Sequence, residues 1–126
     1  CGNDFNNTQK ELYSMSLEQI NHNSNLIKAD MSFKEFTEKS WKLPEEYYGN
    51  RYSVMVHGIG LCDEWPSIRY PTDGGDKSGR FQKNMTITVE SYIGKVGGKE
   101  GVKLEQQYLV GENGLELMSH HPLENI

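Results

Sequence analysis

Two glutamates in this sequence are placed where their carboxylates could share a metal ion. Residues 85–91 and 102–110 each alternate apolar and polar side chains, a pattern that predicts two β-strands. If these strands pair as a hairpin with its turn at Gly97-Gly98, Glu90 lies directly opposite Glu105. Opposed residues on one face have Cβ atoms about 4.5–5.5 Å apart, so the two carboxylates would face each other.

The same register brings together two further pairs that suit each other, Lys95 with Glu100 and Ile93 with Val102. Facing carboxylates destabilise a sheet unless a proton or a cation lies between them. A bridging metal ion would resolve the repulsion. A β-bulge, or an edge strand that leaves both glutamates in solvent, explains the two glutamates alone equally well.

A third possible ligand, His57, favours the metal hypothesis. It ends a short apolar run, residues 53–56, and precedes Gly58-Ile59-Gly60, where absent side chains let a backbone or a substrate approach closely. A lone histidine is more often structural or at the surface. One histidine with two facing glutamates, however, is a nitrogen and oxygen set suited to Zn, Mn, Fe or Co. Three ligands that leave coordination positions open are typical of catalytic sites.

The elements that must position these residues include helices in the first third of the chain. Thr8 to Glu11 has the spacing of a capping box, and Ser32 to Glu35 repeats it before Pro44 ends the second helix. The apolar side chains of this region, aromatic ones included, are interpreted as core and not as a cofactor site: Leu12, Tyr13, Leu17, Ile20, Ile27, Phe33, Phe36 and Trp41.

The remaining segments complete an α+β pattern. Residues 66–80 are rich in Pro, Gly, Asp and Ser and are predicted to form a long surface loop, whose acids fit turn chemistry better than a calcium site. Asn113-Gly114 is a two-residue hairpin signal that leads into a last strand, Leu115 to Met118. Helices followed by antiparallel strands predict the α+β class.

Composition excludes several classes of protein. The net charge of -5 comes with no basic stripe, which argues against a nucleic-acid partner. No apolar run approaches the ~20 residues of a membrane span, so no membrane partner is expected. The two cysteines, Cys1 and Cys62, form neither a disulfide framework nor a CxxC metal motif, and this pattern favours a cytoplasmic setting.

The motifs resemble those of a known family. The segments 57–61, 84–90 and 102–105 are similar, in this order, to the three C-terminal motifs of the pita-bread metalloenzymes, which include creatinase, methionine aminopeptidase and the Xaa-Pro peptidases. The resemblance implies helices packed on a curved antiparallel sheet, a small-molecule or short-peptide substrate, and a homodimer. It also implies two divalent metal ions (Fe, Mn, Zn or Co) held by two aspartates, one histidine and two glutamates, the last three being His57, Glu90 and Glu105.

The two aspartates of that ligand set have no counterpart in the sequence. Asp4 and Asp30 lie in the wrong context, and in the family the second aspartate shortly precedes a Cys-Gly-like segment such as Cys1-Gly2. We therefore expect residues 1–126 to be the C-terminal portion of a pita-bread catalytic domain whose N-terminal part is missing. Such a chain would be inactive alone, although the parent protein would be an enzyme.

The loop after His57 departs from the peptidase pattern. Peptidases of the family have a second histidine there, ahead of a Glu and a Pro. Here Asp63 stands at its place in Cys62-Asp63-Glu64-Trp65-Pro66, and the loop is one residue shorter. The variant is similar to that of the metal-dependent dimethylsulfoniopropionate lyases of this fold. It implies that Asp63 is the base of a β-elimination and that Tyr52 lines the site as a second catalytic residue. Asp63 could instead cap backbone N–H groups of its own loop.

Three functions follow from these patterns. The first is a lyase that cleaves dimethylsulfoniopropionate or a similar small zwitterion. The second is an Xaa-Pro-type metallopeptidase with an altered loop. The third is a metal-free relative that only binds a partner. The missing second histidine separates the first from the second, since His22, His120 and His121 do not match its motif position. The intact metal-ligand set argues against the third.

Overall fold

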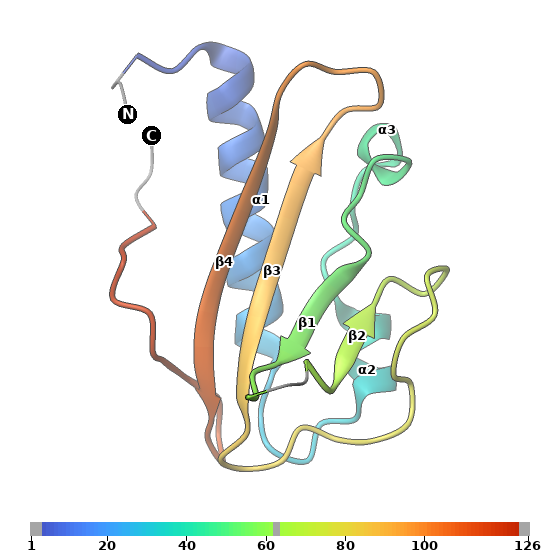
Figure 1. The fold of residues 1–126 in the computed structure, drawn as a ribbon, viewed down its shortest axis with the longest axis vertical. Coiled ribbons are helices and arrows are strands. Elements are labelled where there is room, and N and C mark those ends of the chain that lie inside the picture. Colours follow the sequence, from blue (N-terminus) through green and yellow to red (C-terminus); the bar gives the residue numbers. More distant parts are fainter. Residues whose placement is uncertain (1–3, 62–63, 124–126) are drawn as a thin grey trace.

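The computed structural model describes residues 4–61 and 64–123, and it contains a five-stranded antiparallel sheet with helices packed on it (Figure 1). The strand order is β2-β1-β3-β4-β5. The elements are α1 (Asn7–Leu26), α2 (Phe33–Lys39), α3 (Glu45–Tyr48), β1 (Val54–Gly58), β2 (Ser67–Arg69), β3 (Thr86–Gly94), β4 (Gly101–Val110) and β5 (Leu115–Leu117). The predicted α+β class is confirmed. A hairpin leads into β5 as predicted, but Val110 pairs with Leu115 and the Gly111 N–H donates to the Gly114 carbonyl, so its turn is centred on Glu112-Asn113 and not on Asn113-Gly114.

Helix α1 begins two residues earlier than the capping signal predicted. Its N-cap is Asn6, whose side chain accepts from the Gln9 backbone N–H at 2.9 Å, while the Gln9 side chain accepts from the Asn6 N–H at 3.1 Å. The Thr8 to Glu11 prediction is therefore wrong. Asn6 is the better N-cap because both polar groups of its side chain, and both of the Gln9 side chain, are hydrogen-bonded. Their oxygens accept from the backbone, and their amide nitrogens donate to the Glu100 carboxylate.

The second capping prediction is confirmed, because Ser32 accepts a 3.0 Å hydrogen bond from the Glu35 N–H at the start of α2. The helix ends at Lys39 and not at Pro44, which instead precedes the short helix α3. Two of the aromatic side chains predicted as core, Phe33 and Phe36, are fully buried and pack edge-on against Phe81.

Residues 66–80 were predicted to be a loop throughout. This prediction is wrong in part, because Ser67–Arg69 pair with β1 as an edge strand. Two local features support this strand. Ile68 is fully buried, and the Asp76 side chain accepts from the Ser67 N–H at 2.7 Å. Gly75 has a φ of 83° and lies so close to the Ser67 carbonyl that a Cβ would meet it at 2.6 Å. The strand is short and its stabilising contacts are not local, so composition alone does not indicate it.

The predicted register of β3 and β4 is confirmed. Glu90 pairs with Glu105 and Ile93 with Val102, and the ladder ends at Gly94 and Gly101. The turn itself differs from the prediction. Gly98 N–H donates to the Lys95 carbonyl, so the β-turn lies one residue earlier than Gly97-Gly98, within a loop of residues 95–100. This loop is centred on the same point as the predicted turn, and the register is therefore unchanged.

The predicted contact between Lys95 and Glu100 is absent. Lys95 pairs instead with Glu46 of α3, and Glu100 accepts hydrogen bonds from the start of α1. Both charged side chains find partners in helices that lie near this loop (Figure 1). Tertiary contacts thus replace the local pairing, while leaving the strand alignment as predicted.

The two faces of the sheet differ in what covers them. Helix α1 packs against β3 and β4 (Figure 1). A buried hydrogen-bond chain crosses this interface: Ser16 donates to Ser91, Ser91 to Gln19, and Gln19 to the Tyr70 hydroxyl, at 2.9, 2.7 and 2.6 Å. Because side chains alternate along a strand, Glu90 lies on the face away from α1.

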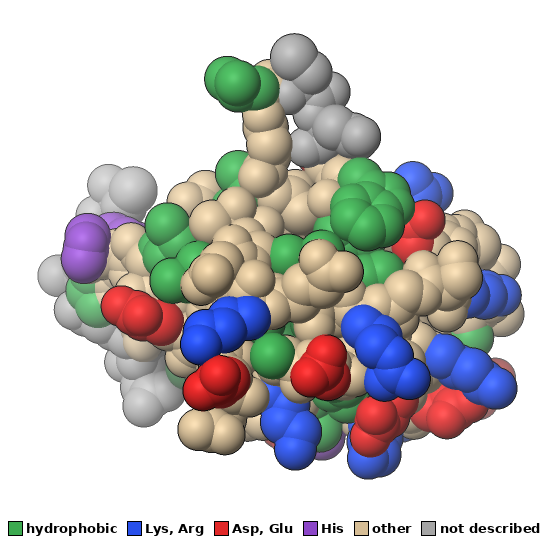
Figure 2. Space-filling model, turned by 90° about the horizontal axis from the view of Figure 1, so that it is seen from below, with side chains coloured by type: hydrophobic (Ala, Val, Ile, Leu, Met, Phe, Trp, Pro, Cys, Tyr) green, Lys and Arg blue, Asp and Glu red, His purple; other side chains and the backbone are tan. Residues whose placement is uncertain are grey.

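The surface is polar and its charges are mixed. Figure 2 shows acidic and basic side chains interspersed over one end of the molecule, without a continuous basic patch on that face. None of the helices in the described ranges has both the length and the apolar character that crossing a membrane requires.

Candidate metal centre

Three neighbouring strands bring His57, Glu90 and Glu105 together. His57 on β1 pairs with Thr88 on β3, and Glu90 on β3 pairs with Glu105 on β4. The His57 Nε2 atom lies 3.0 Å from Glu90 Oε1 and 3.7 Å from Glu105 Oε1. One possible ligand atom from each side chain lies within 4.8 Å of the others, a separation that a single ion can span. The structure therefore brings together the three side chains that the sequence predicted as ligands, and their role as ligands stays a prediction.

The orientation of the His57 ring fits a metal ligand. His57 Nδ1 lies 2.9 Å from the Gly58 carbonyl oxygen, which can only accept, so this nitrogen carries the proton. The other ring nitrogen, Nε2, faces the carboxylate oxygens of Glu90 and Glu105. Lone pairs facing each other at this distance repel unless a proton or a cation lies between them. A histidine that ligates a metal through one ring nitrogen commonly donates its other N–H to a backbone carbonyl, and the Nδ1 contact with Gly58 provides such a partner.

Burial makes the negative charge of the cluster costly unless a positive charge lies nearby. The Glu90 side chain is 2% exposed and that of His57 13%, whereas that of Glu105 is 40% exposed. A buried carboxylate requires a partner of opposite charge. In the structure that partner is Lys103 of β4, whose Nζ lies 2.6 Å from Glu90 Oε2 and 3.5 Å from Glu105 Oε2. An ammonium already located between the two carboxylates shows that this donor set accommodates a cation.

Lys103 was not among the residues singled out from the sequence. The contact with Glu90 raises the pKa of its ammonium above the usual value near 10.5, and Glu105 contributes in the same direction. Lys103 is therefore charged at neutral pH. A signal was present in the sequence, because Lys103 precedes Glu105 by two residues on a predicted strand and so shares its face.

Tyr52, predicted as a second catalytic residue, lies next to the cluster through Lys103. The Lys103 Nζ is 4.5 Å from the centre of the Tyr52 ring, a cation–π contact. The Tyr52 side chain is 43% exposed and does not belong to the ligand cluster itself. The Tyr52 ring thus lies beside the cluster and is partly open to solvent.

After β1 the chain folds back, so that Glu64 and Pro66 contact Gly58 at the end of that strand. Gly58 N–H lies 3.3 Å from the Glu64 carbonyl and 2.8 Å from the Pro66 carbonyl. A Cβ at Gly58 would lie 1.9 Å from the Trp65 carbonyl oxygen, so only glycine permits this approach. The expected close approach of a backbone at the Gly-x-Gly segment is thus confirmed at its first glycine. The predicted base, Asp63, lies outside the described residues.

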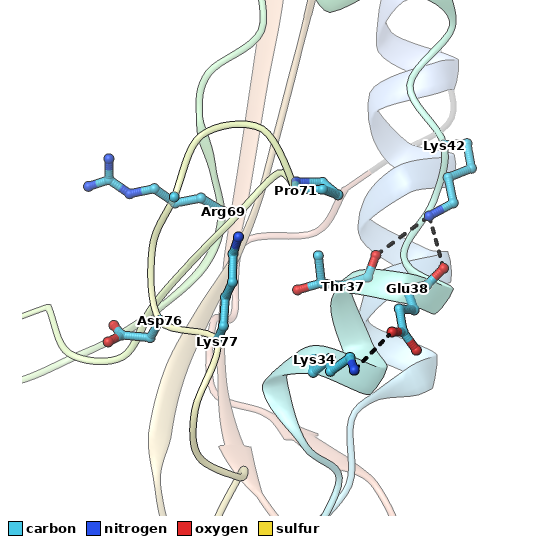
Figure 3. Close-up of a pocket in the computed structure, with 9 residues that line it drawn as sticks. Lys34, Thr37, Glu38, Lys42, Arg69, Pro71, Asp76 and Lys77 are labelled. Carbon is cyan, nitrogen blue, oxygen red and sulfur yellow. Dashed lines mark hydrogen bonds and ion pairs between the residues drawn. The ribbon is translucent and has the colours of Figure 1, made fainter.

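The other histidines and a further pocket lie apart from the cluster. His22 bonds to the Lys39 carbonyl, and His120 and His121 line a separate pocket with side chains of α1 and β5. A further pocket of about 430 Å³ lies between α2 and residues 69–77, lined partly by lysines (Figure 3). It contains none of the three possible ligands, so we do not identify it as the reactive site.

An antiparallel sheet backed by a long helix, with one histidine and two glutamates converging from three adjacent strands, defines a pita-bread metalloenzyme domain. The chain belongs to the metallopeptidase family M24, which it matches over residues 1–112. Enzymes of this family generally hold two metal ions. The family assignment based on the sequence motifs is therefore confirmed, as is the pita-bread fold.

Relatives with two different activities are similar to this chain. It is 35% identical over 109 residues to the dimethylsulfoniopropionate lyase DddP of Roseovarius nubinhibens, covering 85% of this chain and 24% of that protein. It is 33% identical over 119 residues to the Xaa-Pro dipeptidase of Pyrococcus furiosus, covering 90% of this chain and 32% of that protein. The chain thus spans about a quarter to a third of the length of these relatives.

Solved structures show the same fold. The Xaa-Pro dipeptidase from Bacillus anthracis superposes with a TM-score of 0.78 at 28% identity, over 98% of this chain and 34% of that one. The X-Pro aminopeptidase from Thermotoga maritima superposes with a TM-score of 0.75 at 27% identity, over 96% of this chain and 34% of that one.

Proposed function

We propose that this chain is the C-terminal portion of the catalytic domain of a two-metal lyase. The enzyme cleaves dimethylsulfoniopropionate, or a similar small carboxylate, by β-elimination. His57, Glu90 and Glu105 would hold metal, which would be Fe, Mn, Zn or Co on the basis of their nitrogen and oxygen donors. The observation that carries the proposal is this cluster combined with an aspartate, Asp63, where the peptidases have a second histidine.

The position of the loop supports a role for Asp63 in chemistry. The Glu64 and Pro66 carbonyls both accept from the N–H of Gly58, which directly follows His57 in the chain. The chain immediately after position 63 therefore lies at the end of β1. A base must come within hydrogen-bond reach of the proton that it removes, and the anchoring of Glu64 and Pro66 next to His57 supports the proposal that Asp63 acts as this base.

The proposed reaction balances without a further reactant. The bound metal ions would hold the substrate carboxylate and acidify its α-proton. The Asp63 carboxylate removes this proton, the electron pair of the C–H bond becomes the new C=C bond, and the C–S bond breaks. Dimethyl sulfide leaves with the electrons of that bond, and acrylate remains. Tyr52, whose exposed ring lies beside Lys103, would line the substrate side of the site.

A second candidate function is hydrolysis of Xaa-Pro peptides. It is supported by the dipeptidase of Pyrococcus furiosus and by the peptidase structures with a similar fold. Asp63 argues against it, because that position carries a histidine in the peptidase pattern. The two functions differ in their products, so activity assays on both substrates distinguish them.

The test replaces Asp63 with Asn in the full-length protein. Asn keeps the shape of the side chain but cannot accept the proton, so release of dimethyl sulfide should fall by about 10²–10⁴-fold. Metal content, measured by elemental analysis, should stay unchanged. The matched control is Glu64→Gln, which removes the neighbouring carboxylate of the same loop and should retain activity.

Two results would contradict the proposal. Loss of metal together with activity in Asp63→Asn would make Asp63 a ligand or a structural residue. Cleavage of Xaa-Pro dipeptides by the wild-type protein, without dimethyl sulfide from dimethylsulfoniopropionate, would support the peptidase candidate instead.

A further inference from the structure

Lys103 occupies one side of the carboxylate pair. Its ammonium contacts the Oε2 atoms of both Glu90 and Glu105, while the His57 ring faces their Oε1 atoms. Each glutamate thus has one oxygen directed at an imidazole and one directed at an ammonium. The lysine supplies the positive charge that a buried carboxylate and its facing neighbour require.

The side chain of Lys103 is nevertheless only partly enclosed. It is 45% exposed, in contrast to Glu90, and its Nζ has the Tyr52 ring on another side at 4.5 Å. Its backbone is held in β4 opposite Tyr92, so a movement would involve only the flexible side chain. An ammonium can therefore leave the carboxylates for solvent without disturbing the packed face of the sheet.

We propose that Lys103 is an internal counter-cation, which neutralises Glu90 and Glu105 while the site holds no metal and withdraws when a divalent cation binds them. The inference rests on the metal-ligand role in the proposed function but not on the identity of the substrate. It differs from a fixed supporting role, in which Lys103 would keep its contact with Glu90 and strengthen metal binding.

The two roles predict opposite effects of removing the charge. If Lys103 is displaced by metal, Lys103→Met destabilises only the metal-free state, because the loaded state no longer uses the contact. The free energy by which the metal-free state is destabilised then makes metal binding to the Lys103→Met variant tighter by the same amount. If Lys103 supports the ligands permanently, the substitution weakens metal binding, by about 10–100-fold for a lost outer partner.

The experiment titrates Mn²⁺ into the full-length wild-type protein and its Lys103→Met, Lys103→Arg and Lys95→Met variants by calorimetry. We expect the Kd for Mn²⁺ to be about five- to tenfold lower for Lys103→Met, because this variant lacks the ion pair that competes with the metal for the glutamates. Lys103→Arg keeps the charge and should resemble wild type. Lys95→Met removes a lysine paired with Glu46 instead, so it controls for net charge and should bind Mn²⁺ as wild type does.

Thermal unfolding of the same proteins provides a second, independent measurement, the Tm with and without metal. Lys103→Met should have a lower Tm than wild type in the presence of a chelator and an equal Tm in saturating Mn²⁺. Equal or weaker Mn²⁺ binding by Lys103→Met overturns the inference. If that variant does not fold without metal, crystal structures of the wild type decide. The Lys103–Glu90 contact should be present without Mn²⁺ and broken with it, and a contact kept in both overturns the inference.

Failure of the proposed function is distinguishable from failure of this inference. A wild-type protein that binds no Mn²⁺ overturns both. A wild-type protein that binds Mn²⁺ but releases no dimethyl sulfide overturns only the proposed substrate, and the comparison of Lys103 variants still decides the role of this lysine.

Discussion

Glu90 is the residue on which the chemistry of the site depends most. It is almost fully buried, it faces a second carboxylate across the β3–β4 ladder, and it contacts both His57 and Lys103. A charge in this position is retained only with compensating partners, because a buried unpaired carboxylate is strongly destabilising. Its environment is therefore better explained by cation binding than by structural packing.

We predict that Glu90→Gln abolishes tight metal binding by the full-length protein. The neutral amide cannot supply the negative charge of a ligand, so affinity should fall by more than the roughly 10–100-fold seen on loss of an outer partner. Glu116→Gln is the matched control, because Glu116 is an exposed glutamate on the neighbouring strand β5. Calorimetric titration with Mn²⁺ measures both. Retained affinity in Glu90→Gln would exclude Glu90 as a ligand.

Residue-level predictions from the sequence succeeded where a strand pattern constrained them. The alternation along β3 and β4 was sufficient to place Glu90 opposite Glu105. Lys103 was missed because a lysine on a strand is ordinarily solvated, and its contact with Glu90 depends on a rotamer that alternation does not specify. The charge balance of the cluster therefore had to be read from the structure.

At the scale of the elements, the turn out of β1 depends on a glycine. Gly58→Ala would place a Cβ 1.9 Å from the Trp65 carbonyl oxygen, so the returning backbone must shift. We predict a loss of stability of about 1–3 kcal/mol, as for other overpacked sites, together with loss of activity. Gly114→Ala is the control, since a Cβ there meets nothing within 4 Å. Denaturant unfolding compares them, and equal stability of the two variants would contradict the prediction.

The contact between α1 and the sheet depends on a buried amide. Gln19 accepts from Ser91 and donates to Tyr70, so Gln19→Ala leaves buried polar groups without partners. Each such group costs about 1–3 kcal/mol, and we predict a destabilisation in that range. Asn21→Ala removes an exposed amide from the same helix and should change stability little. A loss equally small for Gln19→Ala, measured by denaturant unfolding, would show that water or a rearranged partner replaces the bonds.

Element-level predictions failed where the stabilising contacts are distant in sequence. The start of α1 was misplaced because Asn6 and Gln9 form the capping box in place of Thr8 and Glu11, and the contacts of both with Glu100, far along the chain, add to this cap. Strand β2 was missed because it is held by Asp76 and by the approach of Gly75. The strands with clear alternation needed no such help, and their pairing was predicted correctly.

For the whole molecule, the three clustered side chains provide fewer ligands than a two-metal centre of this family requires. We therefore predict that a protein consisting of residues 1–126 alone binds Mn²⁺ much more weakly than the full-length protein. Calorimetry on both compares affinity and stoichiometry. Tight binding of two ions per chain by residues 1–126 would contradict the proposal that the catalytic domain extends beyond them.

The alignment of β3 with β4 also bears on how the loop of residues 95–100 can change over evolutionary time. Slipping one strand by a single residue would move Glu105 away from Glu90, and it would also turn Tyr108 and Val110 from the interior to the opposite face. Insertions or deletions in the connecting loop are thus expected to be absorbed there. Selection for a well-packed interior is sufficient to keep the two carboxylates opposed, even in lineages where the reaction itself has changed.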